Sequence, residues 1–403
     1  VLVQMYNNMP KLIPFYKDYA AGDELVLTYL ELYDEVTKHG FNRNKPTVYI
    51  NRHDFMCDKD ENEFMEIEFN LMCPTGGFDG YNIQRVLNHY YTLVQRKEVS
   101  LLRSEFKKFQ KSTFVELWSH YHNPDAYAVL LIHKDECNLF EIAQHQALMM
   151  KAGIKTIKIN VQDLHKDKLS LDDKNNLIFY GLEIGLIYYR HLYDASHFIA
   201  DSKHFVVLAE RSNAICLPSV ESWLINGKMN QYLMYSRDVQ QKYGISIDLG
   251  SFAPHLCPHY MLRDNFNNDK QKMLEFIGKD VGGYLLKTFR EGGFGDIIGD
   301  QAMLDFIRDQ PEDVLNRYLL AKRIRPACYP SLVLMAGQTK FFEESVSELG
   351  IFTAAVLNFG SDDKWSVGWQ SEGDGHLLRS KTKTALKGGV AVRVGFIDTL
   401  AHK

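Results

Sequence analysis

The chain has 403 residues, a length that exceeds one compact core and favours two or three domains. Its content of 45% hydrophobic and 24% charged residues is ordinary for a soluble globular protein. The net charge of −5 offers no general attraction to nucleic acid or to an anionic membrane, and no apolar run reaches the ~18 residues of a membrane span.

The chain start and the cysteines bear on the cellular compartment. The opening residues, VLVQM, have neither the basic region nor the small-residue cleavage site of a signal peptide. Because the sequence does not begin with methionine, residues that precede it, such as a removed signal peptide, are not excluded. The six cysteines form no Cys-x-x-Cys pair, which argues against a zinc site and indicates reduced thiols.

The sequence pattern of the first 72 residues predicts helices followed by two strands. Residues 1–45 have helical character, and a helix over 25–40 ends in glycine. A β run at 47–50 then leads to Arg52, so that an arginine stands at the predicted end of a strand. The segment 63–72, EFMEIEFNLM, alternates apolar and polar residues and puts Glu66, Glu68 and Asn70 on one face. Oxygen ligands at this spacing suit Mg²⁺, although the strand alone favours an ordinary exposed polar face.

The middle of the chain predicts a parallel sheet. Helices over 79–121 end at Asn123-Pro124-Asp125, a candidate domain boundary. A strand at 126–132, a helix at 139–151 and a strand at 154–160 form a strand–helix–strand unit. Ligands bind at the carboxyl ends of such strands, where Glu136 with Asn138 and Arg190 with Tyr193 stand. Further predicted strands cover 177–180, 184–189 and 204–208.

After a helical stretch that contains Lys228, the sequence pattern predicts mostly strands up to the end of the chain. These strands cover 284–287, 318–324, 331–335, 346–357 and 390–397.

One glycine-rich stretch, YLLKTFREGGFGDIIGD at 284–300, carries the strongest chemical signal. A short strand delivers Lys287, Arg290 and Glu291 into the loop Gly292-Gly293-Phe294-Gly295. Glycines let backbone N–H groups approach phosphates, the cations supply charge, and a carboxylate beside phosphates favours a divalent metal. The spacing is neither a P-loop nor a Rossmann fingerprint. A glycine loop after a lysine-bearing strand is typical of ATP-grasp ligases, and a solvated hairpin turn is the alternative.

Nine short motifs, in order along nearly the whole chain, resemble the eukaryotic-type glutathione synthetase family of ATP-grasp ligases. They are NRHDFM (51–56), IEFN (67–70), ECNLF (136–140), YRHLY (189–193), ERSNA (210–214), KTFREGG (287–293), SELGIF (347–352), GHLLRSK (375–381) and GGVA (388–391). The resemblance implies an α/β (α+β) ATP-grasp fold with an inserted parallel α/β substrate-binding domain and N-terminal helices. The expected domains are a helical and strand part of the body (1–123), the α/β domain (124–218), and a lid with the C-terminal body (219–403).

The resemblance also implies an activity and its residues. The family joins γ-glutamylcysteine to glycine: ATP phosphorylates the cysteinyl carboxylate, and the glycine amine attacks the acyl phosphate. The implied magnesium ligands are Glu68, Asn70 and Glu291, and the implied ATP contacts are Lys228, Lys287, Gly292, Gly293, Glu348 and Lys381. The implied peptide-substrate contacts are Arg52, Cys73, Thr75, Glu136, Asn138, Arg190, Tyr193, Arg379, Val390 and Ala391. Arg290 and Arg379 match catalytic arginines, Arg290 near the transferring phosphoryl group. A homodimer in the cytoplasm, with no nucleic-acid or membrane partner, is implied too.

Several positions depart from the family pattern and leave two hypotheses open. Cys73 and Thr75 replace serines, Ile142 replaces a glutamine, and Phe294 replaces a loop glycine. The family's Met-Glu-Lys nucleotide hinge reads Ala321-Lys322-Arg323 here, and Arg393 stands in the small-residue loop that closes over the acceptor. The retained magnesium and phosphate residues favour an ATP-dependent ligase. The departures favour an altered acceptor or a diverged protein that binds nucleotide or thiol peptide without turnover.

Overall fold

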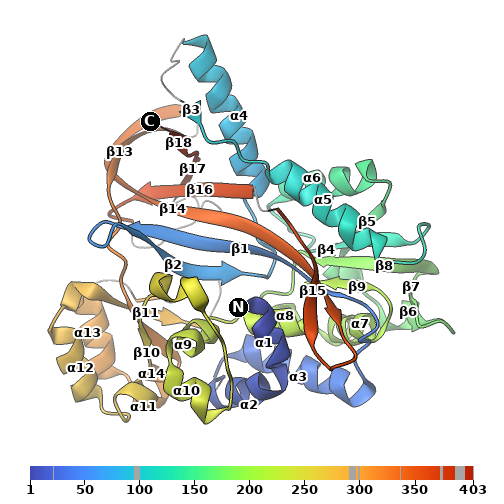
Figure 1. Ribbon diagram of the computed structural model, residues 1–403, viewed down its shortest axis with the longest axis horizontal. Coiled ribbons are helices and arrows are strands. Elements are labelled where there is room, and N and C mark those ends of the chain that lie inside the picture. The colour runs from blue at the N-terminus through green and yellow to red at the C-terminus, as the bar shows by residue number, and fades with distance from the viewer. Residues whose placement is uncertain are drawn as a thin grey trace.

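The computed structural model describes residues 1–20, 22–94, 100–289, 296–297, 300–335, 337–372, 375–385 and 395–402. Within these ranges, two large sheets lie side by side with helices packed around them, and a smaller unit packs at one end (Figure 1). None of the helices described is both long and apolar enough for a bilayer crossing. All six cysteines are free thiols, as their scattered spacing predicts.

The larger sheet is antiparallel and pairs strands from the first 70 residues with strands from the last 75 residues. Its strand order is β17-β16-β14-β1-β2, and β13 and β15 also pair with β14. The strands are β1 (Thr47–Asp58), β2 (Glu63–Asn70), β13 (Tyr329–Met335), β14 (Gln338–Phe359), β15 (Trp365–Gln370), β16 (Gly375–Thr382) and β17 (Phe396–Asp398). The prediction that a strand ends before Arg52 is wrong, because β1 continues to Asp58 and Arg52 lies in its middle.

The second sheet confirms the predicted parallel unit. Strands β4 (Tyr127–Ile132), β5 (Lys155–Asn160), β8 (Leu182–Tyr189) and β9 (Ile215–Leu217) pair in parallel, and helix α6 (Leu139–Lys151) connects β4 to β5. Strands β6 (Leu169–Leu171) and β7 (Leu177–Phe179) extend it antiparallel. Alternate β4 residues enter two different core clusters, so the sheet is buried on both faces.

The strand predicted at 204–208 is wrong. These residues lie inside helix α7 (Ala200–Arg211). The β-branched Val206 and Val207 favour a strand locally, but Phe205 and Ala209 lie one helical turn apart and both are fully buried. Burial of this helical face therefore outweighs the local preference.

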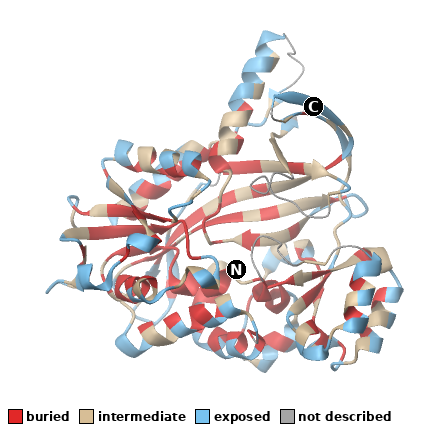
Figure 2. Ribbon diagram, turned by 180° about the vertical axis from the view of Figure 1, so that it is seen from behind, coloured by how far each residue is buried: buried red, intermediate tan, exposed pale blue. Residues whose placement is uncertain are grey.

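Helices cover the sheets and build the chain ends. The amino-terminal helices are α1 (Leu2–Asn7), α2 (Met9–Tyr19) and α3 (Glu24–His39), as predicted for 1–45. Asp23 caps α3 by accepting from the N–H groups of Leu25 and Val26. The other helices around the sheets are α4 (Gly77–Leu93), α5 (Phe106–Ser119), α8 (Val220–Asn226), α9 (Met229–Tyr235) and α10 (Arg237–Lys242). Figure 2 shows the buried residues concentrated in the sheet strands and their flanking helices, whereas the far end of α4 projects from the body.

The smaller unit has its own core. Strands β10 (His259–Tyr260), β12 (Tyr318–Lys322) and β11 (Tyr284–Thr288) form a three-stranded sheet. It packs with α11 (Leu262–Asn265), α12 (Lys270–Gly278), α13 (Asp300–Asp309) and α14 (Glu312–Leu315) around a separate hydrophobic cluster. The predicted strands at 284–287, 318–324, 331–335 and 346–357 correspond to β11, β12, β13 and β14, but strands dominate only after residue 315, because helices fill most of the described part of 220–315. A two-stranded pair, β3 (Ser100–Leu101) with β18 (Ala401–His402), completes the described elements.

Candidate functional site

One face of the large sheet changes from apolar to polar along β1. Val48 and Ile50 are buried in the core, and the next residues on the same face are Arg52 and Asp54. Arg52 pairs with Asn70 across β2, and Asp54 pairs with Glu68. On the other side of β1, Glu348 of β14 pairs with Arg379 of β16. Strand register therefore gathers predicted metal, nucleotide and substrate residues from both ends of the chain.

Asp54 is the centre of this face. Its carboxylate accepts from Arg52 Nε and Nη2, both at 2.8 Å, from Asn70 Nδ2 at 2.9 Å and from Arg379 Nη2 at 2.8 Å. Arg379 also pairs with Glu348. Burial acts to raise the pKa of Asp54, but the two guanidinium groups outweigh it and hold that pKa below its usual value. Asp54 thus stays ionised and fixes two predicted substrate arginines.

A glycine makes this arrangement possible. A Cβ at Gly350, which lies opposite Asp54 on β14, would approach Asp54 Oδ1 to 2.8 Å and Arg52 Cδ to 2.9 Å. Such contacts are closer than carbon atoms tolerate, so the ion pair requires a residue without a side chain at this position.

Lysines and a carboxylate lie beside the Asp54 cluster. Lys228 Nζ lies 3.9 Å from Glu68 Oε2, and Lys287 Nζ donates to the carbonyl of Ile67 at 3.1 Å. Burial lowers the pKa of Lys287, and Lys228 lowers it further while Glu68 opposes. Burial and the nearby Arg323 lower the pKa of Lys381. Crowded, partly desolvated cations of this kind favour an anionic ligand such as a polyphosphate.

The predicted alternation of β2 holds only in part. A register irregularity between Asp54 and Phe55 interrupts the pairing of β1 with β2. Glu66 is fully buried, with Oε1 3.6 Å from His53 Nε2 and accepting from Gln231 Nε2 at 3.4 Å. Since His53 lies on the face of β1 opposite to Asp54, Glu66 does not join Glu68 and Asn70.

The residues described fit a magnesium ion shared with phosphates better than a closed protein site. Among the positions that the structure describes, no group of three or more His, Cys, Asp or Glu side chains has metal-site geometry. The side-chain Nδ2 of Asn70 donates to Asp54, so the side-chain carbonyl oxygen of Asn70 is available to a ligand beside Glu68. Mg²⁺ commonly takes one or two protein oxygens plus phosphates and water, so this pair suits it.

A second cluster joins the two sheets through the turn that follows β2. Arg52 Nη1 donates to the carbonyl of Thr75 at 3.0 Å, and Arg190 Nη1 donates to that of Pro74 at 3.4 Å. The Cys73 thiol donates to the carbonyl of Tyr189 at 3.0 Å. Burial raises the pKa of Cys73 to about 12, so this thiol is not a nucleophile at neutral pH.

Glu141, at the start of α6, organises this second cluster. Its carboxylate accepts from the N–H of Gly76 at 2.9 Å and from Asn138 Nδ2 at 2.9 Å, and it lies 3.5 Å from Arg190 Nη2. Burial raises the pKa of Glu141, although Arg190 opposes the shift. The N–H of Asn138 donates in turn to Glu136 at 2.7 Å. Tyr193 follows β8 with 44% of its surface exposed.

The structure therefore brings the predicted site residues that it describes, apart from Lys381, into one of two adjoining clusters. The Asp54 cluster holds Arg52, Glu68, Asn70, Glu348 and Arg379, with Lys228 and Lys287 beside Glu68. The Glu141 cluster holds Cys73, Thr75, Glu136, Asn138, Arg190 and Tyr193. Lys381 lies two residues after Arg379 on β16, with Arg323 nearby. The predicted residues Arg290, Glu291, Gly292, Gly293, Val390 and Ala391 lie outside the described residues, as do Phe294 and Arg393.

Sequence reasoning missed Asp54 and Glu141, the two buried carboxylates that hold these clusters. The signal for Asp54 was its place two residues after Arg52 on a strand, which puts both side chains on one face. Glu141 is preceded by Asn138 at helical spacing, but a buried glutamate is not distinguishable from an exposed one in a short helix. Ile142, which replaces a family glutamine, is buried in the core.

A match to a family model identifies the family of this chain. Residues 7–401 match the model described as the eukaryotic glutathione synthase ATP-binding domain. The chain belongs to the eukaryotic glutathione synthase family. This agrees with the family expected from the order of the motifs.

Relatives of this glutathione synthase family member are distant in sequence. The chain is 24% identical over 385 residues to the glutathione synthetase of Bos taurus, covering 93% of this chain and 79% of the bovine one. It is 26% identical over 377 residues to the chloroplastic enzyme of Arabidopsis thaliana, covering 87% of this chain but 64% of that protein. The apo structure of a glutathione synthetase-like effector, GSS30 from Globodera pallida, superposes with a TM-score of 0.69 at 15% identity, covering 99% and 86% of the two chains. At this identity the likeness shows a shared fold alone.

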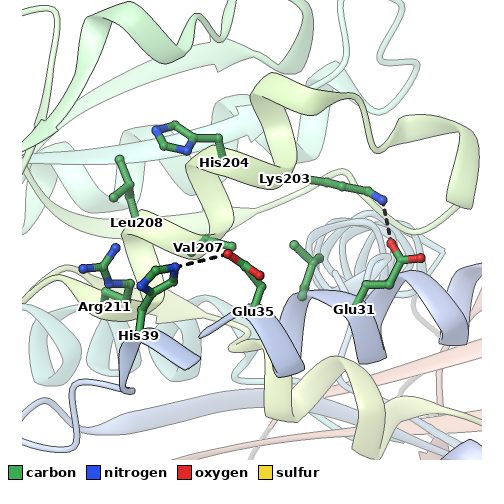
Figure 3. Close-up of a pocket in the computed structure, with 9 residues that line it drawn as sticks. Glu31, Glu35, His39, Lys203, His204, Val207, Leu208 and Arg211 are labelled. Atoms are coloured by element: carbon green, nitrogen blue, oxygen red, sulfur yellow. Dashed lines mark hydrogen bonds and ion pairs between the residues drawn. The ribbon is translucent and has the colours of Figure 1, made fainter. Parts of the chain in front are cut away.

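A surface groove lies apart from these clusters, between α3 and α7 (Figure 3). Its volume is about 410 Å³. An ion pair joins Lys203 of α7 to Glu31 of α3 at 2.8 Å, and a hydrogen bond at 3.2 Å joins His39 to Glu35 within α3. None of its lining residues belongs to the candidate site: Glu31, Leu32, Glu35, His39, Lys203, His204, Val207, Leu208 and Arg211.

Proposed function

We propose that this chain is an ATP- and Mg²⁺-dependent ligase that joins γ-glutamylcysteine to an amino-acid acceptor, with glycine as the first candidate. One observation supports this most. Arg379 and Arg190 are fixed by buried carboxylates, yet the Nε of each is buried and has no partner among the described residues. A buried guanidinium donor is costly to leave unpaired, and a carboxylate ligand satisfies it.

The clusters have separate tasks in this proposal. Lys228, Lys287 and Lys381 hold the ATP phosphates, and Glu68 with Asn70 would hold Mg²⁺, which when bound neutralises phosphate charge. Arg52 and Arg379 hold the donor carboxylate against its repulsion from ATP, and Asp54 fixes their position.

Two balanced steps give the product. A donor carboxylate oxygen attacks the γ-phosphorus of ATP, forming the acyl phosphate as ADP leaves. The acceptor amine then attacks the acyl carbon and loses a proton, and inorganic phosphate leaves as the amide forms.

ADP release by purified protein tests the proposal. Release that requires ATP, Mg²⁺, γ-glutamylcysteine and glycine together supports the glycine ligase. Release that requires another amino acid supports a ligase with an altered acceptor. Binding of ATP or donor without ADP release for any acceptor supports the binding protein instead. The homodimer implied by resemblance is a separate proposal, tested by the mass of the protein in solution.

A further inference from the structure

Three histidines gather where β4 and β8 end. Leu131 of β4 pairs with Tyr189 of β8 in parallel register, so His133 and His191, two residues later, point to the same side of neighbouring strands. Their ring centroids are 4.8 Å apart, which matches the spacing of paired strands. His197, in the short 3₁₀ helix Ala195–His197, stacks on His191 with centroids 3.8 Å apart and planes 25° apart. We call these three residues the histidine cluster.

The cluster has buried nitrogen atoms that lack hydrogen-bond partners. His191 is 3% exposed, and within the described chain neither of its ring nitrogens has a partner. Nδ1 of His197 is buried and unpaired in the same way. His133 differs, because its Nδ1 accepts from the N–H of Asp135 at 3.1 Å. Buried polar atoms almost always have a partner, in the protein or in ordered water, so these nitrogens can take a hydrogen-bond partner from outside the chain.

The backbone next to His191 is held in an uncommon conformation. Leu192 is fully buried and has a φ of 76°, in the left-handed region that leucine rarely adopts. Tyr193 follows, and its ring lies edge-on to His191 at 5.3 Å and to His197 at 5.0 Å. Local strain of this kind persists where the surrounding structure demands it, as at binding sites.

Tyr193 connects the histidine cluster to the candidate site. Burial raises the pKa of Tyr193, and Cys73 and Glu136 raise it further while Arg190 opposes. These neighbours place the cluster beside residues already expected to meet the donor substrate. Tyr193 itself is partly exposed and borders the cluster.

The charge state of the cluster depends on its neighbours. Burial lowers the pKa of His191 to about 3, and His197 and His133 lower it further while Asp194 opposes. Burial also lowers the pKa of His197, with Asp194 opposing and His133 adding to the shift. Without a ligand these two imidazoles are therefore neutral at neutral pH. An anion bound against them would favour a protonated ring and thus draw a proton from solvent.

We propose that the histidine cluster is a specificity-determining subsite that binds the α-carboxylate at the γ-glutamyl end of the donor and takes up a proton as it does so. This inference rests on the proposed function, because that function supplies the donor. A protonated imidazole and its neighbour offer N–H donors to two carboxylate oxygens. A metal ion is a poorer occupant, because no described trio of His, Cys, Asp or Glu side chains has metal-site geometry.

Calorimetry of donor binding in two buffers of different ionisation enthalpy tests the proton uptake directly. At about pH 7, wild type should take up close to one proton per γ-glutamylcysteine bound. Glutaryl-cysteine, which keeps the carboxylate but lacks the amine, should take up the same number of protons on binding as γ-glutamylcysteine. 4-Aminobutanoyl-cysteine, which lacks the carboxylate, should bind weakly and without proton uptake. Donor binding without uptake, or equal uptake by all three compounds, overturns the inference.

Kinetics of the variants gives a second readout. For wild type, KM of the donor should fall by up to about tenfold per pH unit as the pH drops from about 8 to about 6. In His191→Gln the pH dependence of the donor KM, called the slope below, should vanish while kcat and the KM for ATP change little. His197→Gln should weaken the slope and serves as the alternative should His191→Gln fail to fold. His89→Gln, an exposed histidine on α4, is the control and should keep the wild-type slope.

The outcomes separate this inference from the proposed function. Donor-dependent ADP release with an unchanged slope in both variants overturns the role of the cluster and leaves the ligase intact. Proton-linked donor binding without ADP release supports the cluster and overturns the ligase. Thermal unfolding of each variant shows whether a loss reflects the fold, because a purely structural histidine would lower stability without changing the slope.

Discussion

Arg379 and Asp54 are 325 positions apart in the chain, yet the guanidinium Nη2 lies 2.8 Å from the carboxylate Oδ2. Two antiparallel pairings, of β14 with β1 and with β16, bring them together. The same carboxylate holds Arg52, so one buried anion positions two cations. A buried charge of this kind contributes little net stability but is costly to disrupt.

Replacing Asp54 by asparagine should destabilise the fold by about 3–5 kcal/mol, because it leaves the buried Arg52 guanidinium without its anion and removes one of the two carboxylate partners of Arg379. Urea unfolding measures the change. The control is Asp125→Asn, which breaks an exposed pair with Lys155. It should leave the free energy of unfolding nearly unchanged, because both partners are exposed to solvent. Equal effects of the two substitutions would contradict the central role of Asp54.

Gly350→Ala should lower both stability and ligation, since a methyl group there collides with the Arg52–Asp54 pair. Overpacking of a tight site costs about 1–3 kcal/mol. The matched control is Gly278→Ala at the end of α12, where nothing lies within 4 Å of an added Cβ. That control should be neutral or stabilising by up to about 1 kcal/mol. Thermal unfolding and ADP release together check both expectations.

Arg379→Ala should depress ligation strongly while sparing ATP binding, because the proposed partner of Arg379 is the donor carboxylate. Loss of one buried charge-assisted pair costs about 2–5 kcal/mol. Steady-state kinetics with the dipeptide and a nucleotide titration separate the two effects. Arg308→Ala, in an exposed pair with Asp305, serves as the control. If ATP binding falls as far as ligation, Arg379 contacts the nucleotide instead.

Glu68→Gln should raise the Mg²⁺ concentration needed for ATP turnover, because a neutral amide is a weaker ligand than a carboxylate. The lost transition-state stabilisation should amount to several kcal/mol, on the order expected for a metal ligand. A Mg²⁺ titration of ADP release measures it. Glu63→Gln, at the exposed start of the same strand, should leave the titration unchanged. An unshifted titration for Glu68→Gln would show that this carboxylate does not bind the metal.

Acid should destabilise the fold through His259, whose Nδ1 donates to the carbonyl of Cys257 at 2.8 Å. Burial, with Lys287 adding to it, lowers the pKa of His259 to about 3 from 6.5. The unfolded chain therefore binds the proton first, so stability is full above pH 6.5 and falls as the pH drops toward 3. At about pH 5 the loss is about 2 kcal/mol. His259→Gln should remove that part of the acid dependence in urea unfolding, whereas exposed His204→Gln should not.

Much of this molecule follows from local pattern. The unbroken apolar run of β4, the helix after it and the strand β5 are encoded within one segment, and the parallel unit followed directly. Alternation in β2 likewise placed Glu68 and Asn70 on one face. The order of the motifs indicated the family that the match over 7–401 established.

Tertiary structure alone decided how these parts meet. The helix over 204–208 depends on burial against a sheet, and the separation of Glu66 from Glu68 depends on an irregularity in pairing with β1. Asp54, Glu141 and the histidine cluster acquire their roles only from strands distant in sequence. Side-chain periodicity is a property of one segment, whereas register and burial arise from pairing between segments, and charges become buried and costly only after that pairing is made.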